Sequence, residues 1–214
     1  MKLSLRIPTT LNDIKLSQYK EFIEATKDNE DVDYINRKTI SIFCNIDESL
    51  VGKMKKSDFN DALETIEKAL EQKPKFVERF KMNGVEYGFI PKLDDITLDE
   101  QADIDTLLKD VKTFDKAAAV MYRPITVKKR DKYLIEDYKG EGNSLDVPLD
   151  IMLGAIDFFL TLQNDLLNYT LNYIGQEAVK DKKILQTLEQ NGVGIKTITD
   201  LRKGISLNSM MSVS

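Results

Sequence analysis

The sequence predicts a mainly helical α+β fold, and three observations lead to that class. Several stretches of the chain place apolar residues at the three-and-four spacing of a helix face. Two regions near the middle read as short extended runs around turn signals, which is typical of β-hairpins. One long stretch after Pro148 is apolar over most of a helix circumference, which suits a spine helix. A chain of 214 residues can bury a full hydrophobic core, so we expect a single domain.

The N-terminal part is expected to be helical throughout. Residues 16–26 carry apolar side chains at helix spacing, and residues 31–46 do so again, although with more β-branched residues. Asp47 and Ser57 stand directly before two further apolar-periodic stretches, so we expect them to be the N-caps of a short and a longer helix. Pro74 follows the longer one, as is common just beyond a helix end.

A small β element is expected in the middle of the chain. Asn83 and Gly84 lie between two short extended runs, and this pair favours a type I′ turn because both positions tolerate positive φ. A single hairpin is marginally stable, so it should pair with other strands. Residues 123–129 and 132–139 are the candidates, and the basic run 128–132 would then be a hairpin tip.

Seven acidic residues crowd the stretch from Phe89 to Asp110. Thr97 and Glu100 have the spacing of a capping box, in which each side chain satisfies the other residue's backbone N–H. Acids in a first helical turn also suit the positive end of the helix dipole. The stretch lacks the Asp-x-Asp-x-Asp-Gly pattern of a calcium loop. We interpret it as a capped, solvated helix start, with a magnesium site as the alternative.

The longest predicted helix runs from Pro148 to Gly175. Asp146 is a suitable N-cap, and the missing N–H of Pro148 costs nothing in the first turn. Polar residues fall in one narrow stripe along this helix: Asp150, Asp157, Thr161, Asn164, Asn168 and Asn172.

This helix is not expected to cross a membrane. Three aspartates interrupt it, and each would cost about 2.5–3.5 kcal/mol at the bilayer centre. A helix that is apolar almost all round is buried, either in the core of its own domain or against another chain. Oligomer contact is therefore one of two interpretations, and we expect Phe158, Phe159 and Leu166 to belong to such a contact.

Composition argues against several function classes. Histidine is absent, which removes the usual general base, the Ser-His and Cys-His pairs and imidazole metal ligands. Cys44 is the sole cysteine, so no internal disulfide can form, and we interpret it as a small buried residue. The formal net charge of −5 disfavours nucleic-acid binding. Residues 191–197 resemble a phosphate loop only superficially, because Ile195 separates Gly194 from Lys196. The start has no apolar run of signal-peptide length, so we expect a product made in the cytoplasm.

The order of several segments resembles small virion-associated proteins of tailed phages that infect Bacteroidetes, the crAss-like group among them. The segments are "YGFIPKLDDITLDEQADID", "AAAVMYRPI" further along the chain, and "SLDVPLDIMLGAIDFFLTLQNDLL". "ISIFCNI…M…SDF" is also similar to tail-assembly chaperones. The resemblance covers most of residues 11–175 and carries structural motifs, so it implies no catalytic residues.

The resemblance also suggests which residues hold the fold. A helix over 111–123 is expected to stop at Pro124, so Arg123 would lie over its last carbonyls or pair with an acid of the earlier stretch. The candidate partners are Asp94, Asp95 and Glu100. Replacing Arg123 with methionine should then cost more than about 1 kcal/mol, above the usual value for a surface pair.

The sequence predicts one domain, 1–214. Its expected parts are a helical part at 11–74, a β-hairpin and helix pair at 75–140, a long helix with a C-terminal helix at 146–190, and a loose tail at 205–214. The expected function is that of a non-enzymatic phage virion protein, such as a neck or tail ring component or a packaged cargo protein. It would bind other virion proteins or copies of itself and need no metal or cofactor. A soluble tail-assembly chaperone is the first alternative, and a metal-dependent enzyme using the acids of 94–105 is the second.

Overall fold

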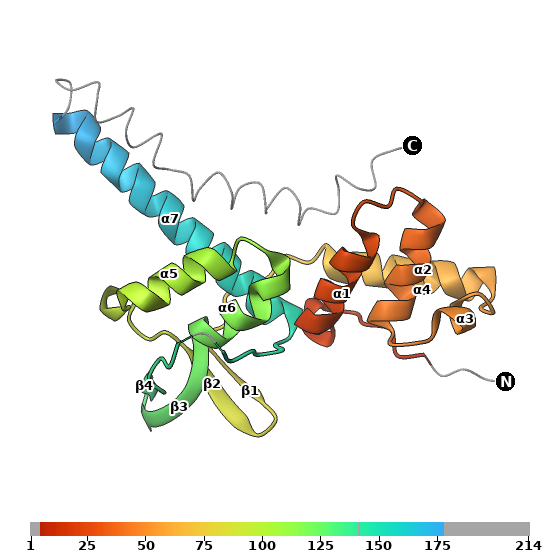
Figure 1. Cartoon of the computed structure of the whole chain (residues 1–214), viewed down its shortest axis with the longest axis horizontal. Coiled ribbons are helices and arrows are strands. Elements are labelled where there is room, and N and C mark those ends of the chain that lie inside the picture. Colours follow the sequence, from red (N-terminus) through yellow and green to blue (C-terminus); the bar gives the residue numbers. More distant parts are fainter. Residues whose placement is uncertain (1–4, 141, 178–214) are drawn as a thin grey trace.

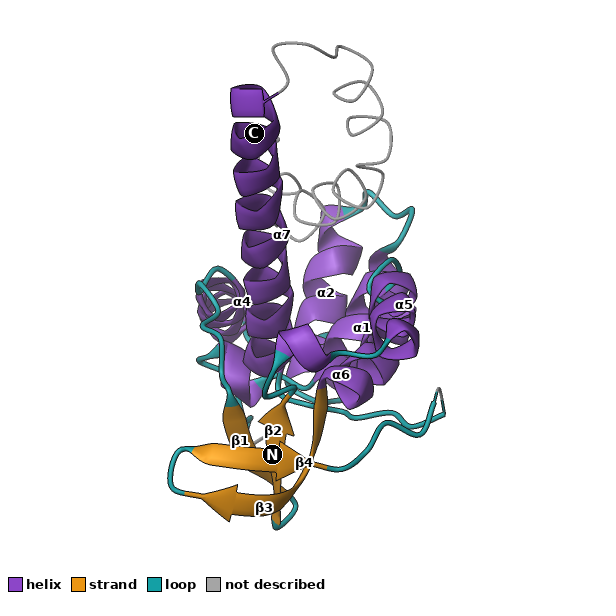
Figure 2. Cartoon of the chain, turned by 90° about the vertical axis from the view of Figure 1, so that its left-hand side faces the viewer, coloured by secondary structure: helices purple, strands orange, loops and turns teal. Residues whose placement is uncertain are grey.

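The computed structural model describes residues 5–140 and 142–177. Within them the chain is α+β, with seven α-helices and one four-stranded antiparallel sheet in the order β1-β2-β3-β4 (Figures 1 and 2). The helices are α1 Leu16–Thr26, α2 Val32–Phe43, α3 Glu48–Val51, α4 Lys56–Leu70, α5 Leu98–Leu107, α6 Phe114–Met121 and α7 Leu149–Glu177. The strands are β1 Arg79–Met82, β2 Val85–Phe89, β3 Tyr122–Lys129 and β4 Lys132–Ile135. The predicted C-terminal helix, which ends by residue 190, the turn at 191–197 and the tail at 205–214 lie outside the described residues.

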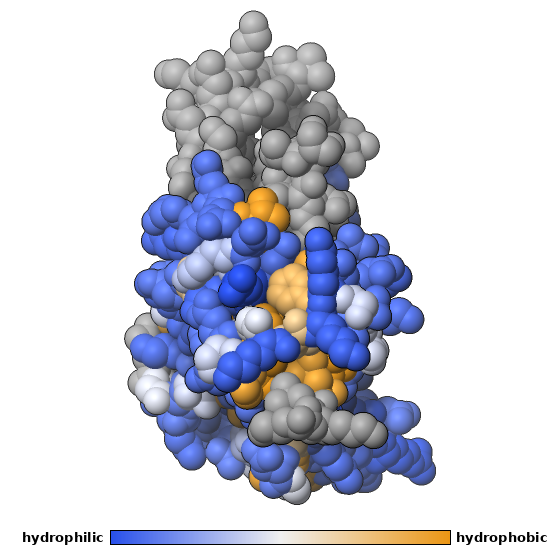
Figure 3. Space-filling model, turned by 90° about the vertical axis from the view of Figure 1, so that its right-hand side faces the viewer, coloured by the Kyte–Doolittle hydropathy of each residue, from blue (hydrophilic) through white to orange (hydrophobic). Residues whose placement is uncertain are grey.

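The four N-terminal helices confirm the helical reading of that part. In α1 the predicted apolar face is buried, and Phe22 packs against Phe43 of α2 with ring centroids 5.1 Å apart. Asp47 caps α3 by accepting a hydrogen bond from the Ser49 N–H. The prediction for α4 is wrong in detail, because Lys55 precedes it and Ser57 lies inside its first turn. The outer face of this group is mostly hydrophilic, with hydrophobic atoms showing at its centre (Figure 3).

Both predicted hairpins form, and together they make the sheet. Asn83 and Gly84 have φ of 51° and 82°, which confirms the left-handed turn between β1 and β2. Arg130 also has positive φ, at the tip between β3 and β4. The two hairpins join through antiparallel pairing of β2 with β3, in which Gly88 lies opposite Arg123. The sheet lies at one end of the molecule, below α5 and α6 in Figure 1.

The predicted helix over 111–123 is shorter than expected. After a turn of 3-10 helix, α6 covers Phe114–Met121 only, and Tyr122 already begins β3. Arg123 is therefore in a strand and does not lie over the last carbonyls of α6, which corrects that alternative. The reason is local, since a residue before proline favours extended backbone, and Pro124 follows Arg123. The Tyr122 hydroxyl also donates to the Val77 carbonyl at 2.8 Å, which fixes the start of the strand.

Asp146 caps a different helix from the one predicted. Its carboxylate accepts hydrogen bonds from the Ser17 N–H at 2.8 Å and the Ser17 hydroxyl at 2.9 Å, so it satisfies the first turn of α1. Backbone bonds from Leu16 to Val147 and from Leu149 to Ile14 hold the two segments side by side.

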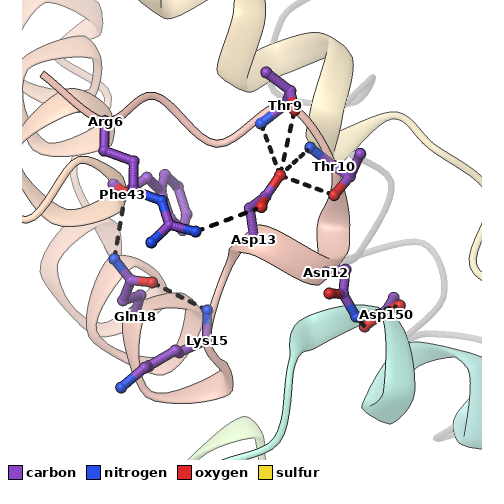
Figure 4. Close-up of polar contacts among 9 residues, drawn as sticks. All are labelled: Arg6, Thr9, Thr10, Asn12, Asp13, Lys15, Gln18, Phe43 and Asp150. Carbon is purple, nitrogen blue, oxygen red and sulfur yellow. Dashed lines mark hydrogen bonds and ion pairs between the residues drawn. The ribbon is translucent and has the colours of Figure 1, made fainter.

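The side chains of this junction extend it in both directions (Figure 4). The Asn12 amide donates to Asp150 at the start of α7, with a shortest distance of 3.0 Å. On the other side, Gln18 donates to the Ile42 carbonyl of α2 at 2.8 Å. The N-terminal segment therefore ties the start of α7 to the end of α2.

One hydrophobic core joins these elements. Its large, fully buried members come from the N-terminal segment, α1, α2, α4, α6, β3 and α7: Ile14, Leu16, Ile40, Ile66, Phe114, Met121, Tyr122, Leu149 and Met152. Gly154 allows α7 to approach the chain before β1, because a Cβ there would lie 2.3 Å from the Lys75 carbonyl oxygen. Among the described helices, none is both long and apolar enough to cross a bilayer.

The environment of α7 changes along its length. Residues 151–156 are buried, those at 157–160 are half-buried, and Leu162 is 42% exposed. Thr161, Asn164 and Asn168 of the predicted polar stripe are exposed. Figure 2 shows that the later part of this helix extends beyond the sheet and the other described helices.

Candidate functional site

The acidic stretch folds as the sequence predicts at its centre. Thr97 precedes α5, and its hydroxyl accepts a hydrogen bond from the Glu100 N–H at 3.2 Å. The Glu100 carboxylate accepts in return from the Thr97 N–H and hydroxyl, both at 2.8 Å. The capping box is therefore confirmed. It orients the Glu100 side chain back over the start of the helix, toward the sheet.

Arg123 meets Glu100 among the three candidate acids. Its Nη2 lies 2.5 Å from Glu100 Oε1, and both side chains are nearly buried, at 11% and 6% exposure. Asp95 lies elsewhere and pairs with Lys92 at 3.1 Å on the surface. Asp94 belongs to the same short 3-10 turn, Leu93–Asp95. The ion pair thus joins α5 to β3.

Aromatic and polar contacts surround the ion pair. The Arg123 guanidinium lies over the Tyr138 ring, 5.9 Å from its centroid, and the Tyr138 hydroxyl donates to Asp103 of α5. The Nε of Arg123 is buried and has no hydrogen-bond partner among the described residues. A three-part contact therefore holds α5, β3 and the segment after β4 together.

Opposing effects set the ionisation of Glu100. Burial by itself raises the pKa of this carboxyl, but the hydrogen bonds from Thr97 and the charge of Arg123 outweigh burial and lower the pKa below its ordinary value. The group is therefore a buried, paired anion at neutral pH. A proton acceptor in catalysis has its pKa raised toward the operating pH, so this site has the electrostatics of a structural ion pair.

The remaining acids of the stretch have separate surroundings. The Asp110 carboxylate accepts from the Lys112 N–H at 3.0 Å and caps a 3-10 turn. Burial raises the pKa of Asp105. Within residues 5–140 and 142–177, no three His, Cys, Asp or Glu side chains gather closely enough to hold a metal ion.

Two hollows adjoin Arg123, the larger of which Glu100 also lines, and no sequence pattern indicates either of them. The smaller has a volume of about 210 Å³ and lies among α6, Arg123 and the segment after β4. The larger has a volume of about 770 Å³ and runs between β4 and residues 90–100. Both arise where segments distant in the sequence meet, so no local pattern could have indicated them.

Phe158 and Phe159, predicted as contact residues, pack inside the chain. Phe158 stacks on Phe76 with ring centroids 4.3 Å apart, and Phe159 lies 5.5 Å from Phe89. Both remain half-buried. The side chain of Leu166, predicted with them, lies outside the described part of α7. Contacts within the chain therefore explain why phenylalanine stands at positions 158 and 159 of α7.

Cys44 is buried, in keeping with its interpretation as a small core residue. Burial raises the pKa of its thiol to about 11. At neutral pH this side chain is therefore a protonated thiol, and only thiolates are strong nucleophiles.

The chain was also compared with known protein families, curated proteins and solved structures. No family model matches the chain, and no curated protein or solved structure matches it.

Proposed function

We propose that this chain is a non-enzymatic virion-associated protein of a tailed phage that acts through protein–protein contacts. In this proposal α7 is a long spine helix. Its first part anchors the helix in the core, and its later part is buried against other virion proteins or against copies of the same chain. The proposed site of action is the particle, after synthesis in the host cytoplasm.

One observation carries the proposal: an apolar helix continues past the core that anchors it. Leu162 is 42% exposed, while polar Thr161 beside it is exposed as well. Full burial of a leucine side chain contributes about 1.5–3 kcal/mol, so an apolar helix face that is exposed to water would gain free energy by packing against a partner. The stretch 157–177 spans about 32 Å at the helical rise per residue, which is long enough for a specific contact.

The Arg123–Glu100 cluster supports the same class of function. Its carboxylate has a lowered pKa and two hydrogen bonds from Thr97, which suits a rigid scaffold. A protein that serves as a contact element benefits from a body that holds its projecting helix in a fixed direction.

Assembly through α7 is tested by light scattering on the full chain after size-exclusion chromatography. We expect a mass above that of the monomer, alone or mixed with purified virion proteins, and we expect Leu162→Glu to abolish it. Thr161→Glu adds the same charge on the neighbouring polar position and should leave the mass unchanged. An equal effect of the two variants would contradict a contact through the apolar face.

The place of action is tested by mass spectrometry of purified particles of the phage that encodes the chain. Finding the chain in washed particles at a constant copy ratio supports a virion protein. Its presence in infected cells and absence from particles would instead favour the assembly chaperone. Heat on titration with magnesium, manganese or calcium would favour the metal-dependent enzyme.

A further inference from the structure

We propose that the groove beside β4 binds an extended, basic peptide segment of another protein, which adds to the sheet as a fifth strand. This contact is independent of the one proposed for α7, because the two lie on different elements and can be removed separately. The inference rests on three properties of the groove: the strand that borders it, its exposed apolar side chain, and its charge.

The groove follows the free edge of the sheet. In the strand order β1-β2-β3-β4, β4 is terminal, and among the described residues it pairs with β3 alone. All four residues of β4, Lys132–Ile135, line the groove. Because alternate residues of a strand point to opposite faces, a hollow lined by four in succession runs along the backbone edge. An open strand edge presents unpaired N–H and C=O groups, and it is the surface to which extended peptides add.

An apolar side chain stands exposed on this edge. Leu134 lines the groove and is 59% exposed, while Val127, its cross-strand partner on β3, is 55% exposed but does not line the groove. Ile90 and Pro91 line the opposite wall. A peptide with an apolar residue at alternate positions could therefore bury one side chain against Leu134 while its backbone pairs with β4.

The charge of the lining identifies the partner. Seven carboxylates line the groove, Glu78, Asp95, Asp99, Glu100, Asp131, Glu136 and Asp137, against three cationic side chains, Lys92, Arg123 and Lys132, a net charge of −4. Glu100 and Asp95 are paired with cations of the same lining, and Glu136 is paired with Lys139 outside it, so the excess comes from the other four acids. Such a surface attracts lysine- and arginine-bearing segments. It also repels a second copy of itself, which disfavours edge-to-edge pairing of two identical chains.

The test uses the full chain and a synthetic peptide of roughly eight residues, a usual strand length, in which lysine alternates with leucine. One leucine is replaced by tryptophan. The chain contains no tryptophan, so fluorescence excited at the red edge of indole absorption reports the peptide alone. We expect saturable binding that weakens as salt is raised toward about 1 M, where the Debye length falls to about 3 Å and charges are screened from one another. A peptide with glutamate in place of lysine should not bind.

Matched variants locate the contact. Leu134→Ser should weaken peptide binding about tenfold, whereas Val127→Ser, an equally exposed position outside the groove, should leave it within about twofold. Asp131→Asn combined with Asp137→Asn should weaken binding and reduce its salt dependence. Asp58→Asn combined with Glu71→Gln, which removes the same charge from α4 and the residue that follows it, should do neither. Circular dichroism confirms that each variant is folded.

Three results would overturn the inference. One is equal binding of the lysine and glutamate peptides, and another is equal losses in Leu134→Ser and Val127→Ser. The third is a doubling of molecular mass that depends on Leu134, which would make a second copy the occupant. A peptide methylated on alternate backbone nitrogens tests strand addition, since it should bind about tenfold more weakly. Leu162→Glu should keep full peptide binding, so a failed assembly test for α7 leaves this one intact.

Discussion

Replacing Arg123 with methionine should lower the free energy of unfolding by about 2–3 kcal/mol. Removing one partner of a buried ion pair costs about 3–5 kcal/mol, because the other charge stays buried without compensation. Here Glu100 keeps both hydrogen bonds from Thr97, which still stabilise its charge, so the expected cost lies at or just below the lower end of that range. The side chains are only 11% and 6% exposed, which leaves little solvent to screen the loss. Urea denaturation followed by circular dichroism measures the change.

A double-mutant cycle separates the interaction energy of the Arg123–Glu100 pair from the effect of changing the shape of either side chain. Glu100→Gln keeps an acceptor for Thr97 and removes the charge, so Arg123→Met should cost less in that background, by about 1 kcal/mol or more. The surface pair of Lys92 and Asp95, whose side chains are 75% and 68% exposed, is the control. Lys92→Met should change stability by less than about 0.5 kcal/mol. A coupling energy for the buried pair no larger than that of the surface pair would refute the reasoning.

Three further predictions concern acid, packing and reactivity. The pKa of Glu100 is lower in the folded chain than in the unfolded chain, so its ionised form stabilises the fold above the ordinary pKa of about 4.3. In acid denaturation series, the difference in stability between wild type and Glu100→Gln should therefore disappear as the pH falls through the pKa of the folded chain. Gly154→Ala should destabilise the chain by about 1–3 kcal/mol in thermal unfolding, because the new Cβ would meet the Lys75 carbonyl at 2.3 Å. Cys44 should react with a chromogenic disulfide at pH 8 only after unfolding, since burial holds its pKa at about 11, and fast labelling of the native chain would contradict this.

Local signals predicted the elements that depend on few neighbours. The turn at Asn83 and Gly84 follows from the backbone freedom of those two residues, and the box of Thr97 and Glu100 closes within one helical turn. The amphipathic spacing of α1 likewise fixes its buried face without outside help. In each case the partners lie within a few residues, so the sequence contains the whole interaction.

Interactions between distant segments were predicted less well. Asp146 has the chemistry of an N-cap, but the backbone amides nearest to it in space belong to α1 rather than to the helix that follows. The choice of Glu100 over Asp94 and Asp95 as the partner of Arg123 depends on which carboxylate the fold buries. The groove beside β4 has no local signature, because its two walls come from residues 90–100 and 131–138.

The bond between Ser17 and Asp146 spans 129 positions of the chain. During translation the first turn of α1 must wait for its cap until the ribosome has released nearly the whole described portion. Until residue 146 has left the ribosome, the start of α1 therefore lacks the Asp146 carboxylate, and a chain that stops before residue 146 cannot form this contact. Emergence of the start of α7 is thus the step that completes the cap of α1.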